Sequence, residues 1–139
     1  MVTKDEIISF LKDLSSIENL HEHSDIFEEG ICGDDFHEMI DEYAIKYSVD
    51  MDGYLWYFHA DEEGMPGISE MLFTPPYKRV KRIPLTPGLL ADFANKGKWD
   101  IKYPELKIPE KRYDLMINQI LLILVLLLVI LGVVMNIFG

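Results

Sequence analysis

The feature that most constrains this chain is a long apolar stretch toward its C-terminal end. Residues 115–138 read LMINQILLILVLLLVILGVVMNIF, in which the only clearly polar side chains are Asn118, Gln119 and Asn136. As a helix, these 24 residues reach ~36 Å, enough to cross a hydrocarbon core of ~30 Å. A core helix of a soluble protein has a polar face, and the centre of this stretch has none. The sequence therefore predicts a transmembrane helix over residues 115–138.

Charges beside the span predict its orientation. Lys107, Lys111 and Arg112 precede it, in a basic juxtamembrane linker at residues 107–114, and no charged side chain follows it. Because basic residues near a span stay on the cytoplasmic side, we expect the preceding domain to be cytoplasmic, at the inner membrane if the source is bacterial. The expected topology is a single-pass tail anchor. A lone span without ionisable residues is not expected to form a channel or a transporter.

The rest of the chain carries its charge unevenly. The net charge is −11, and residues 1–70 hold 19 Asp and Glu against three Lys, a net of −16. Residues 71–114 hold five acids against ten Lys and Arg, a net of +5. An acidic surface repels phosphates, so nucleic-acid binding is not expected. The acidity fits a basic protein partner, and the alternative is that it only keeps a small domain soluble.

Residues 1–106 are predicted to form a mainly α-helical domain with short extended segments. The first helix is expected at residues 3–14, where Thr3 and Glu6 have the T-x-x-E spacing of a capping box. A long connection at residues 15–34 follows, and a connection of this length in a compact domain usually has a function or contains turns of its own.

The second helix is the clearest one in this domain. It is expected at residues 35–47, DFHEMIDEYAIKY, with Asp34 or Asp35 as its N-cap. Its apolar side chains follow the i, i+3, i+4 spacing of one helical face. The opposite face is acidic and consists of Asp35, Glu38, Asp41 and Glu42.

The third helix is expected at residues 87–96. Thr86 is its predicted cap, Pro87 occupies the first helical position, and Gly97 ends it. Weaker patterns predict a short helix or extended segment at 51–60, a turn at 61–67, a helical turn at 68–73, an extended segment at 77–85 and a short strand or extended tail at 99–103.

Candidate residues for metal binding or catalysis do not form a recognisable set. His21 and His23 lie two residues apart in a loop, and His37 and His59 are separate, with no Cys or His at zinc-ligand spacing. Cys32, the only cysteine, precedes a helix that can lower a thiol pKa, but no partner base is identified. Paired carboxylates are frequent, and none is marked as an acid–base pair in a cleft. We predict no enzyme activity and no metal site.

A basic cluster at residues 78–82 has two interpretations. Together with the juxtamembrane residues it can contact anionic lipid headgroups, or it can neutralise the acidic part of its own domain. The candidates for headgroup contact are Lys78, Arg79, Lys81, Arg82, Lys111 and Arg112.

Residues 25–47, DIFEEGICGDDFHEMIDEYAIKY, resemble the central part of acyl carrier proteins. That family has a loop ending in Gly-x-Asp-Ser-hydrophobic, followed by an acidic amphipathic helix, and Gly33-Asp34-Asp35-Phe36 occupies this place here. IPLTPGLLADF resembles the start of the last carrier helix, and GKWDIKYPEL resembles a bacterial family of short acidic carrier-like proteins of unknown function. The resemblance extends over residues 3–96 in element order and implies an acyl-carrier-like helical bundle.

The sequence departs from the carrier family at the residue that matters most. Carrier proteins attach phosphopantetheine to a serine at the start of the second helix, and the matching position here is Asp35. A carboxylate cannot form that phosphodiester, so the resemblance implies a carrier fold without the prosthetic group, and no cofactor is expected. Ser24 and Ser48 are the nearest serines. The family presents its second helix to basic patches on enzymes, which by position implies partner contacts at Asp35, Glu38, Asp41 and Glu42.

These observations lead to one expected function and two alternatives. We expect a non-enzymatic, membrane-tethered docking or regulatory module that presents an acidic helix to a basic patch on a protein partner. The first alternative is an acyl or phosphopantetheine carrier that uses an atypical serine. The second is a small accessory subunit whose transmembrane helix binds a larger membrane protein.

Overall fold

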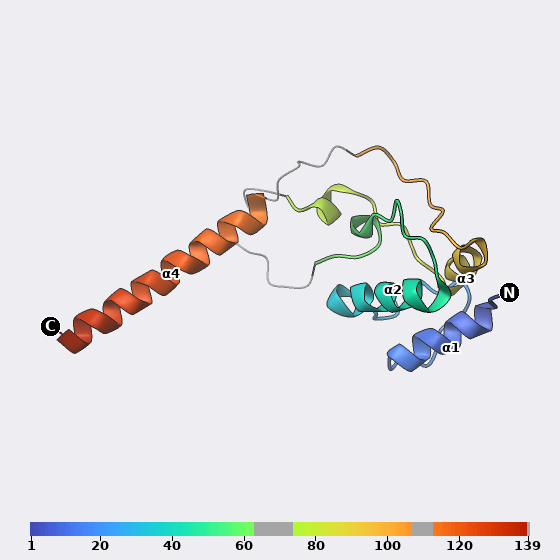
Figure 1. Ribbon diagram of the computed structural model, residues 1–139, viewed down its shortest axis with the longest axis horizontal. Helices are drawn as coiled ribbons and strands as arrows, with labels where there is room; N and C mark the ends of the chain where they lie inside the picture. Colours follow the sequence, from blue (N-terminus) through green and yellow to red (C-terminus); the bar gives the residue numbers. More distant parts are fainter. Residues whose placement is uncertain (63–73, 107–112, 139) are drawn as a thin grey trace. The chain divides into compact units, whose positions relative to one another are not determined.

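The computed structural model of the 139-residue chain describes residues 1–62, 74–106 and 113–138 (Figure 1). These residues form four α-helices and two short 3-10 helices, and no β-strand is present among them. The chain divides into two compact units, one of Met1–Glu63 with Val80–Leu106 and the other of Gly64–Arg79 with Lys107–Gly139. The prediction of a mainly α-helical protein is confirmed.

Helix α1 (Lys4–Leu14) begins at its predicted cap. The Thr3 side chain accepts a hydrogen bond from the Glu6 backbone N–H at 3.1 Å, and the Ser15 N–H closes the last turn on Leu11. Its buried side chains are Ile7, Phe10 and Leu11. The cap and the apolar face therefore lie where the sequence pattern placed them, because both depend on contacts within one or two helical turns.

Helix α2 (Gly33–Tyr47) begins two residues earlier than predicted. Its N-cap is Cys32, which makes no side-chain cap hydrogen bond, so the prediction of Asp34 or Asp35 as the cap is wrong. The Phe36 N–H donates to the Cys32 carbonyl at 3.4 Å, so the first helical hydrogen bond already spans Gly33. Gly33 itself takes a φ of +57°, which glycine adopts without the steric penalty of a side chain. The two aspartates lie in the first turn instead, where negative charge interacts favourably with the helix dipole.

Helix α3 (Pro87–Lys96) has the predicted bounds and the predicted signals at both ends. Thr86 accepts from the Leu89 N–H at 3.3 Å, Pro87 begins the helix, and Gly97 ends it with a φ of +70°. The Gly88 N–H donates to the Glu22 carbonyl at 2.9 Å, and a Cβ on Gly88 would lie only 3.0 Å from that oxygen. The lack of a side chain at Gly88 therefore lets the long connection approach α3 closely.

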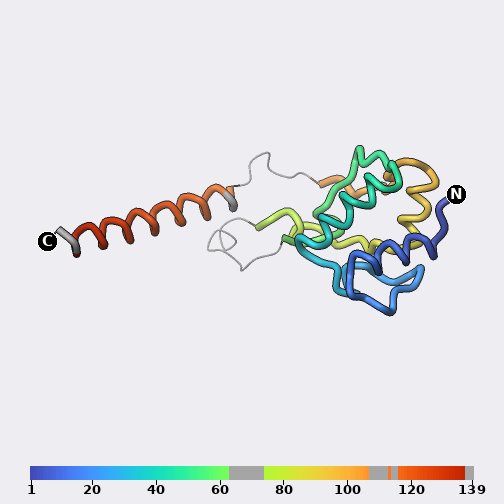
Figure 2. The backbone as a smooth tube through the Cα atoms, turned by 60° about the horizontal axis from the view of Figure 1, so that its bottom comes forward, coloured from blue at the N-terminus to red at the C-terminus, as the bar shows by residue number. Residues whose placement is uncertain are grey.

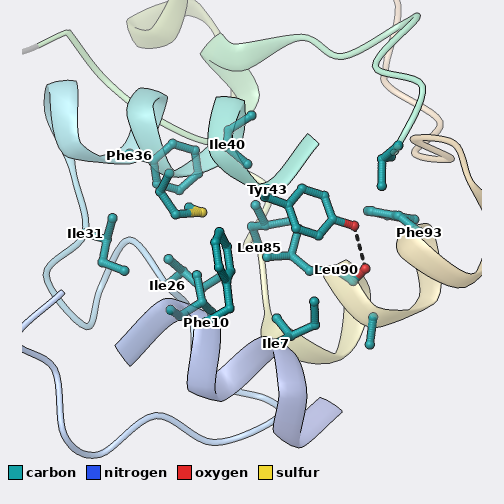
Figure 3. Packing of buried hydrophobic residues seen from close by; sticks show 14 of the residues in the cluster. Ile7, Phe10, Ile26, Ile31, Phe36, Ile40, Tyr43, Leu85, Leu90 and Phe93 are labelled. Atoms are coloured by element: carbon teal, nitrogen blue, oxygen red, sulfur yellow. Dashed lines mark hydrogen bonds between the residues drawn. The ribbon is translucent and has the colours of Figure 1, made fainter. Parts of the chain in front are cut away.

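The core of the first unit joins these three helices (Figure 3). Figure 3 shows Phe10 of α1 and Phe36 of α2 in one cluster, with Leu90 and Phe93 supplied by α3. The Tyr43 hydroxyl donates to the Leu90 carbonyl at 2.6 Å inside this cluster. The long connection also enters the core, through the buried side chains of Ile26 and Ile31.

Two segments without α-helix complete the first unit. The chain forms the 3-10 helix η1 (Trp56–Phe58), and a single parallel bridge joins Asp50 to Lys98. After this bridge the buried Trp99 and the half-buried Tyr103 continue an extended tail, as predicted for residues 99–103.

The sequence pattern predicted an extended segment at residues 77–85, and this prediction is wrong for the first part of the segment. The 3-10 helix η3 (Pro76–Arg79) occupies the first part of this segment, because Pro76 fixes the backbone φ of its own position near the value of a helical turn. The expected helical turn at 68–73, most of the turn at 61–67 and residues 107–112 of the linker lie outside the described residues.

Helix α4 (Tyr113–Phe138) is one continuous helix in both views (Figure 2). The segment Met116–Asn136 has a mean hydropathy of 3.0 and none of it is buried. It is long and apolar enough to cross a membrane. The predicted helix over residues 115–138 is therefore present and begins two residues earlier, at Tyr113.

Candidate functional site

Three of the four predicted partner-binding acids line one groove of about 450 Å³ on the first unit. One wall is the outer face of α2, which contributes Asp35, Glu38 and Glu42. The facing walls are the end of α1 with the turn after it, residues 14–17, and the turn at residues 29–31. A groove of this volume falls within the range of ligand-binding pockets.

Helical spacing explains why these three carboxylates share a wall. Asp35, Glu38 and Glu42 are related by i, i+3 and i+7, so they follow one stripe along α2, and all three are exposed. Glu29 adds a fourth carboxylate from the facing turn, and no lysine or arginine is among the lining residues. The groove is therefore strongly negative and selects for a cationic ligand.

The bottom of the groove is apolar. Met39 of α2 and Ile31 of the facing turn are buried side chains of the core that also line the groove. Leu14 at the end of α1 lines it as well and is 42% exposed. An occupant can thus place an apolar group against these side chains while its cations meet the carboxylates above them.

Asp41 lies outside the groove. Burial is the main cause that raises the pKa of the Tyr54 hydroxyl, and electrostatic interactions with Tyr103 and Asp41 raise it further. The sequence pattern placed Asp41 with the other acids because it is exposed on the same broad helical face. It did not predict Glu29 or Leu14, since only the folded connection brings them opposite α2.

Asp35, the position that the predicted resemblance matches to the carrier serine, lies on the groove wall. Asp35 is the third residue of α2, and its side chain is exposed. Of the two serines considered as substitutes, Ser24 accepts a hydrogen bond from the His21 N–H at 3.1 Å, and Ser48 ends α2 in a left-handed conformation. Neither lines the groove, whereas the exposed Ser16 does.

The histidines do not converge on a common site. Within residues 1–62, 74–106 and 113–138, no group of three or more His, Cys, Asp or Glu side chains could hold a metal ion. His21 and His23 are exposed, and His37 contacts the Trp56 ring. Cys32 is exposed at the N-cap of α2.

His59 is completely buried and has a structural hydrogen-bond network. Its Nδ1 lies 2.9 Å from the Ile83 carbonyl, which can only accept, so Nδ1 carries the proton. Nε2 then accepts from the Tyr103 hydroxyl at 2.8 Å, and Trp99 Nε1 donates to the same hydroxyl at 2.7 Å. Burial is the main cause that lowers the pKa of His59 to about 4. This network joins three segments that are distant in sequence.

The predicted lipid-contact residues are divided between the two units. Lys78 and Arg79 belong to the unit that contains α4, whereas Lys81 belongs to the first unit, and all three are exposed. Lys111 and Arg112 lie outside the described residues.

Arg82 is engaged inside the first unit. Its guanidinium pairs with Asp25 at 2.7 Å and with Glu28 at 2.9 Å, and it lies 4.9 Å from the centre of the Phe27 ring. Its side chain is 28% exposed, and that of Asp25 is 12% exposed. Arg82 thus neutralises acids of its own domain and holds the long connection against the segment before α3.

Comparison with known proteins identifies no relative: no protein family, curated protein or solved structure matches this chain. The resemblance to acyl carrier proteins stays a prediction from the sequence.

Proposed function

We propose that this protein is a non-enzymatic docking module, tethered to a membrane by α4, whose acidic groove binds a basic segment of a protein partner. The observation that carries this proposal is the groove itself. It places four carboxylates around an apolar bottom and has no cationic side chain among its lining residues.

Electrostatics supports a protein partner with lysines or arginines. Exposed carboxylates attract cations over a distance of about one Debye length, which is ~8 Å at physiological ionic strength. Such complementarity raises association rates and selects partners more than it raises affinity. The expected interaction is therefore transient, specific for charge and weakened by salt, which is typical of a regulatory interaction.

The membrane side of the proposal rests on α4 and its flanking charges. A helix of this length and hydropathy is expected to insert as a single-pass anchor, and the basic residues before it favour a cytoplasmic domain. Lys78, Arg79 and Lys81 are proposed to contact anionic headgroups, and a lysine or arginine at the membrane surface contributes about 1 kcal/mol of attraction. Arg82 has acidic partners within its own domain and is assigned a structural role.

A carrier-like origin is part of the same proposal. The helix, long acidic connection, acidic helix and later helix follow one another in the order expected from the resemblance. With Asp35 at the attachment position, the domain would keep the acidic docking helix of a carrier and lack its acyl-bearing group.

The test compares partner capture by two full-length variants in mild detergent. In the groove variant the four carboxylates that line the groove become amides: Glu29→Gln, Asp35→Asn, Glu38→Gln and Glu42→Gln. The matched control neutralises four exposed acids elsewhere in the domain: Asp5→Asn, Asp52→Asn, Asp92→Asn and Glu105→Gln. Cross-linking in the native cells, followed by mass spectrometry, identifies the captured proteins.

We expect the wild type and the control variant to capture the same protein, and the groove variant to lose it. The purified partner should then bind the wild type directly, with an affinity that falls as salt is raised. Capture that is unchanged by the groove variant, or lost equally in the control, contradicts the proposal.

A further inference from the structure

A large apolar side chain is exposed on the same helix as the acids of the groove. Ile45 is 81% exposed. Among the described residues of the first unit, the other exposed large apolar side chains are Met1 at the chain start and Leu14 in the groove, which is only 42% exposed. An isolated surface isoleucine is ordinary, so its meaning depends on its neighbours.

Those neighbours are acidic. Ile45 follows Glu42 by three residues, Asp41 by four and Glu38 by seven, which are the spacings of side chains that adjoin on a helix. Asp41, which does not line the groove, is thus a neighbour of Ile45 on α2. The acidic stripe that lines the groove continues along α2 into an apolar position bordered by carboxylates.

The basic residue next to Ile45 does not neutralise this surface. Lys46 is the one lysine or arginine of α2, and its ammonium lies 4.6 Å from the centre of the Phe10 ring, on the side of the helix that packs on α1. The outer face of α2 therefore keeps its negative charge around Ile45.

We propose that Ile45 is the apolar anchor of the docking surface, so that the partner segment is amphipathic and basic, with an apolar side chain flanked by lysines or arginines. This inference rests on the proposed function and specifies its ligand. Charge complementarity decides the occupant. A second copy of this chain would bring identical acidic faces together, and anionic lipid would be repelled in the same way. A cationic partner covers Ile45 and at the same time pairs its charges with the surrounding carboxylates.

The experiment measures binding of two synthetic helical peptides to the full-length protein in nanodiscs of zwitterionic phosphatidylcholine. One peptide is lysine-rich with a stripe of leucines, and the other has each leucine replaced by glutamine. Fluorescence anisotropy at low salt gives the dissociation constants, and empty nanodiscs give the background. The protein variants are Ile45→Ala, Ile45→Leu and the groove variant with four amides.

We expect the leucine peptide to bind the wild type more tightly than the glutamine peptide. Ile45→Ala should weaken the binding of the leucine peptide alone, raising its dissociation constant about tenfold. A tenfold change corresponds to about 1.4 kcal/mol, which is the order of free energy that burial of an aliphatic side chain contributes. Ile45→Leu should retain the wild-type affinity. Both substitutions are expected to fold, since position 45 makes little contact with the core, and circular dichroism checks this.

Three outcomes overturn the inference in distinguishable ways. If the groove variant loses both peptides while Ile45→Ala binds like the wild type, the acidic docking function stands and Ile45 is not its anchor. If the groove variant binds both peptides as the wild type does, or if neither peptide binds the wild type, the proposed function itself fails. If Ile45→Ala converts a dimer into a monomer in sedimentation, the occupant is a second copy.

Discussion

Lowering the pH should destabilise the first unit through His59. Burial holds the pKa of this imidazole at about 4, against an ordinary value of 6.5 in the unfolded chain. The folded state therefore requires the neutral ring, and the stabilisation is fully present above pH 6.5 and lost as the pH falls from 6.5 toward 4. At about 1.4 kcal/mol per pH unit, the full loss over this window is about 3 kcal/mol.

Most of this loss of stability occurs in a pH range where carboxylates stay ionised. By pH 5 the stability should have dropped by about 2 kcal/mol relative to pH 8, which corresponds to roughly 10 °C in the melting temperature of a domain of this size. The geometry supports this effect independently, because a protonated Nε2 could no longer accept from the Tyr103 hydroxyl, whose O–H would lose this hydrogen-bond acceptor. The nearby charges of Arg82 and Asp25 act on the His59 pKa in opposite directions, with smaller effects than burial.

The assay is thermal unfolding of the full chain in non-ionic detergent, followed by tryptophan fluorescence at pH 8 and pH 5. The variant His59→Asn removes the titrating ring, and the matched control His23→Gln removes an exposed one. We expect His59→Asn to be less stable at pH 8 and to show a shallower pH dependence than the wild type, whereas the control keeps the wild-type dependence. An equal pH dependence in His59→Asn and wild type refutes the reasoning.

Three further predictions concern Gly88, Arg82 and Asp35. Gly88→Ala should lower the free energy of unfolding by roughly 1 kcal/mol, because its Cβ would press on the Glu22 carbonyl; an unchanged chemical-denaturation midpoint would contradict this. Arg82→Met should lower the free energy of unfolding by about 1–3 kcal/mol, because it leaves a partly buried carboxylate without its partner. Lys81→Met, at an exposed position, should leave the free energy of unfolding nearly unchanged in the same measurement. Protein purified from its own cells should have its unmodified intact mass, since Asp35 stands at the position that the resemblance matches to the carrier serine; a mass increase matching phosphopantetheine would instead support the carrier alternative.

Local signals were sufficient for the helices. Thr3 and Thr86 cap α1 and α3 as predicted, and Gly97 ends α3. Each of these features depends on hydrogen bonds between residues at most four apart, and such neighbours are fixed by the sequence. The start of α2 was missed because its first hydrogen bond runs from the Phe36 N–H to the Cys32 carbonyl, which places the N-cap before the aspartates that the pattern marked as caps.

The candidate site was only partly predictable. The acidic stripe of α2 follows from helical periodicity, but the groove requires Glu29 and Leu14, which reach α2 only after the long connection has folded. The sequence also gave no reason to distinguish His59 from the exposed histidines. Its burial depends on Ile83 and Tyr103, which lie 24 and 44 residues away.

The sequence by itself determined that this chain has an acidic helical domain and a helix long enough to cross a membrane, because charge, hydropathy and helical period are properties of composition and of near neighbours. Only the tertiary structure decided which acids face a common groove, that Arg82 is held by Asp25 and Glu28, and that Ile45 stays exposed among carboxylates. These outcomes depend on packing between segments far apart in the chain, where many arrangements satisfy the same local pattern and the burial of the shared apolar core selects one.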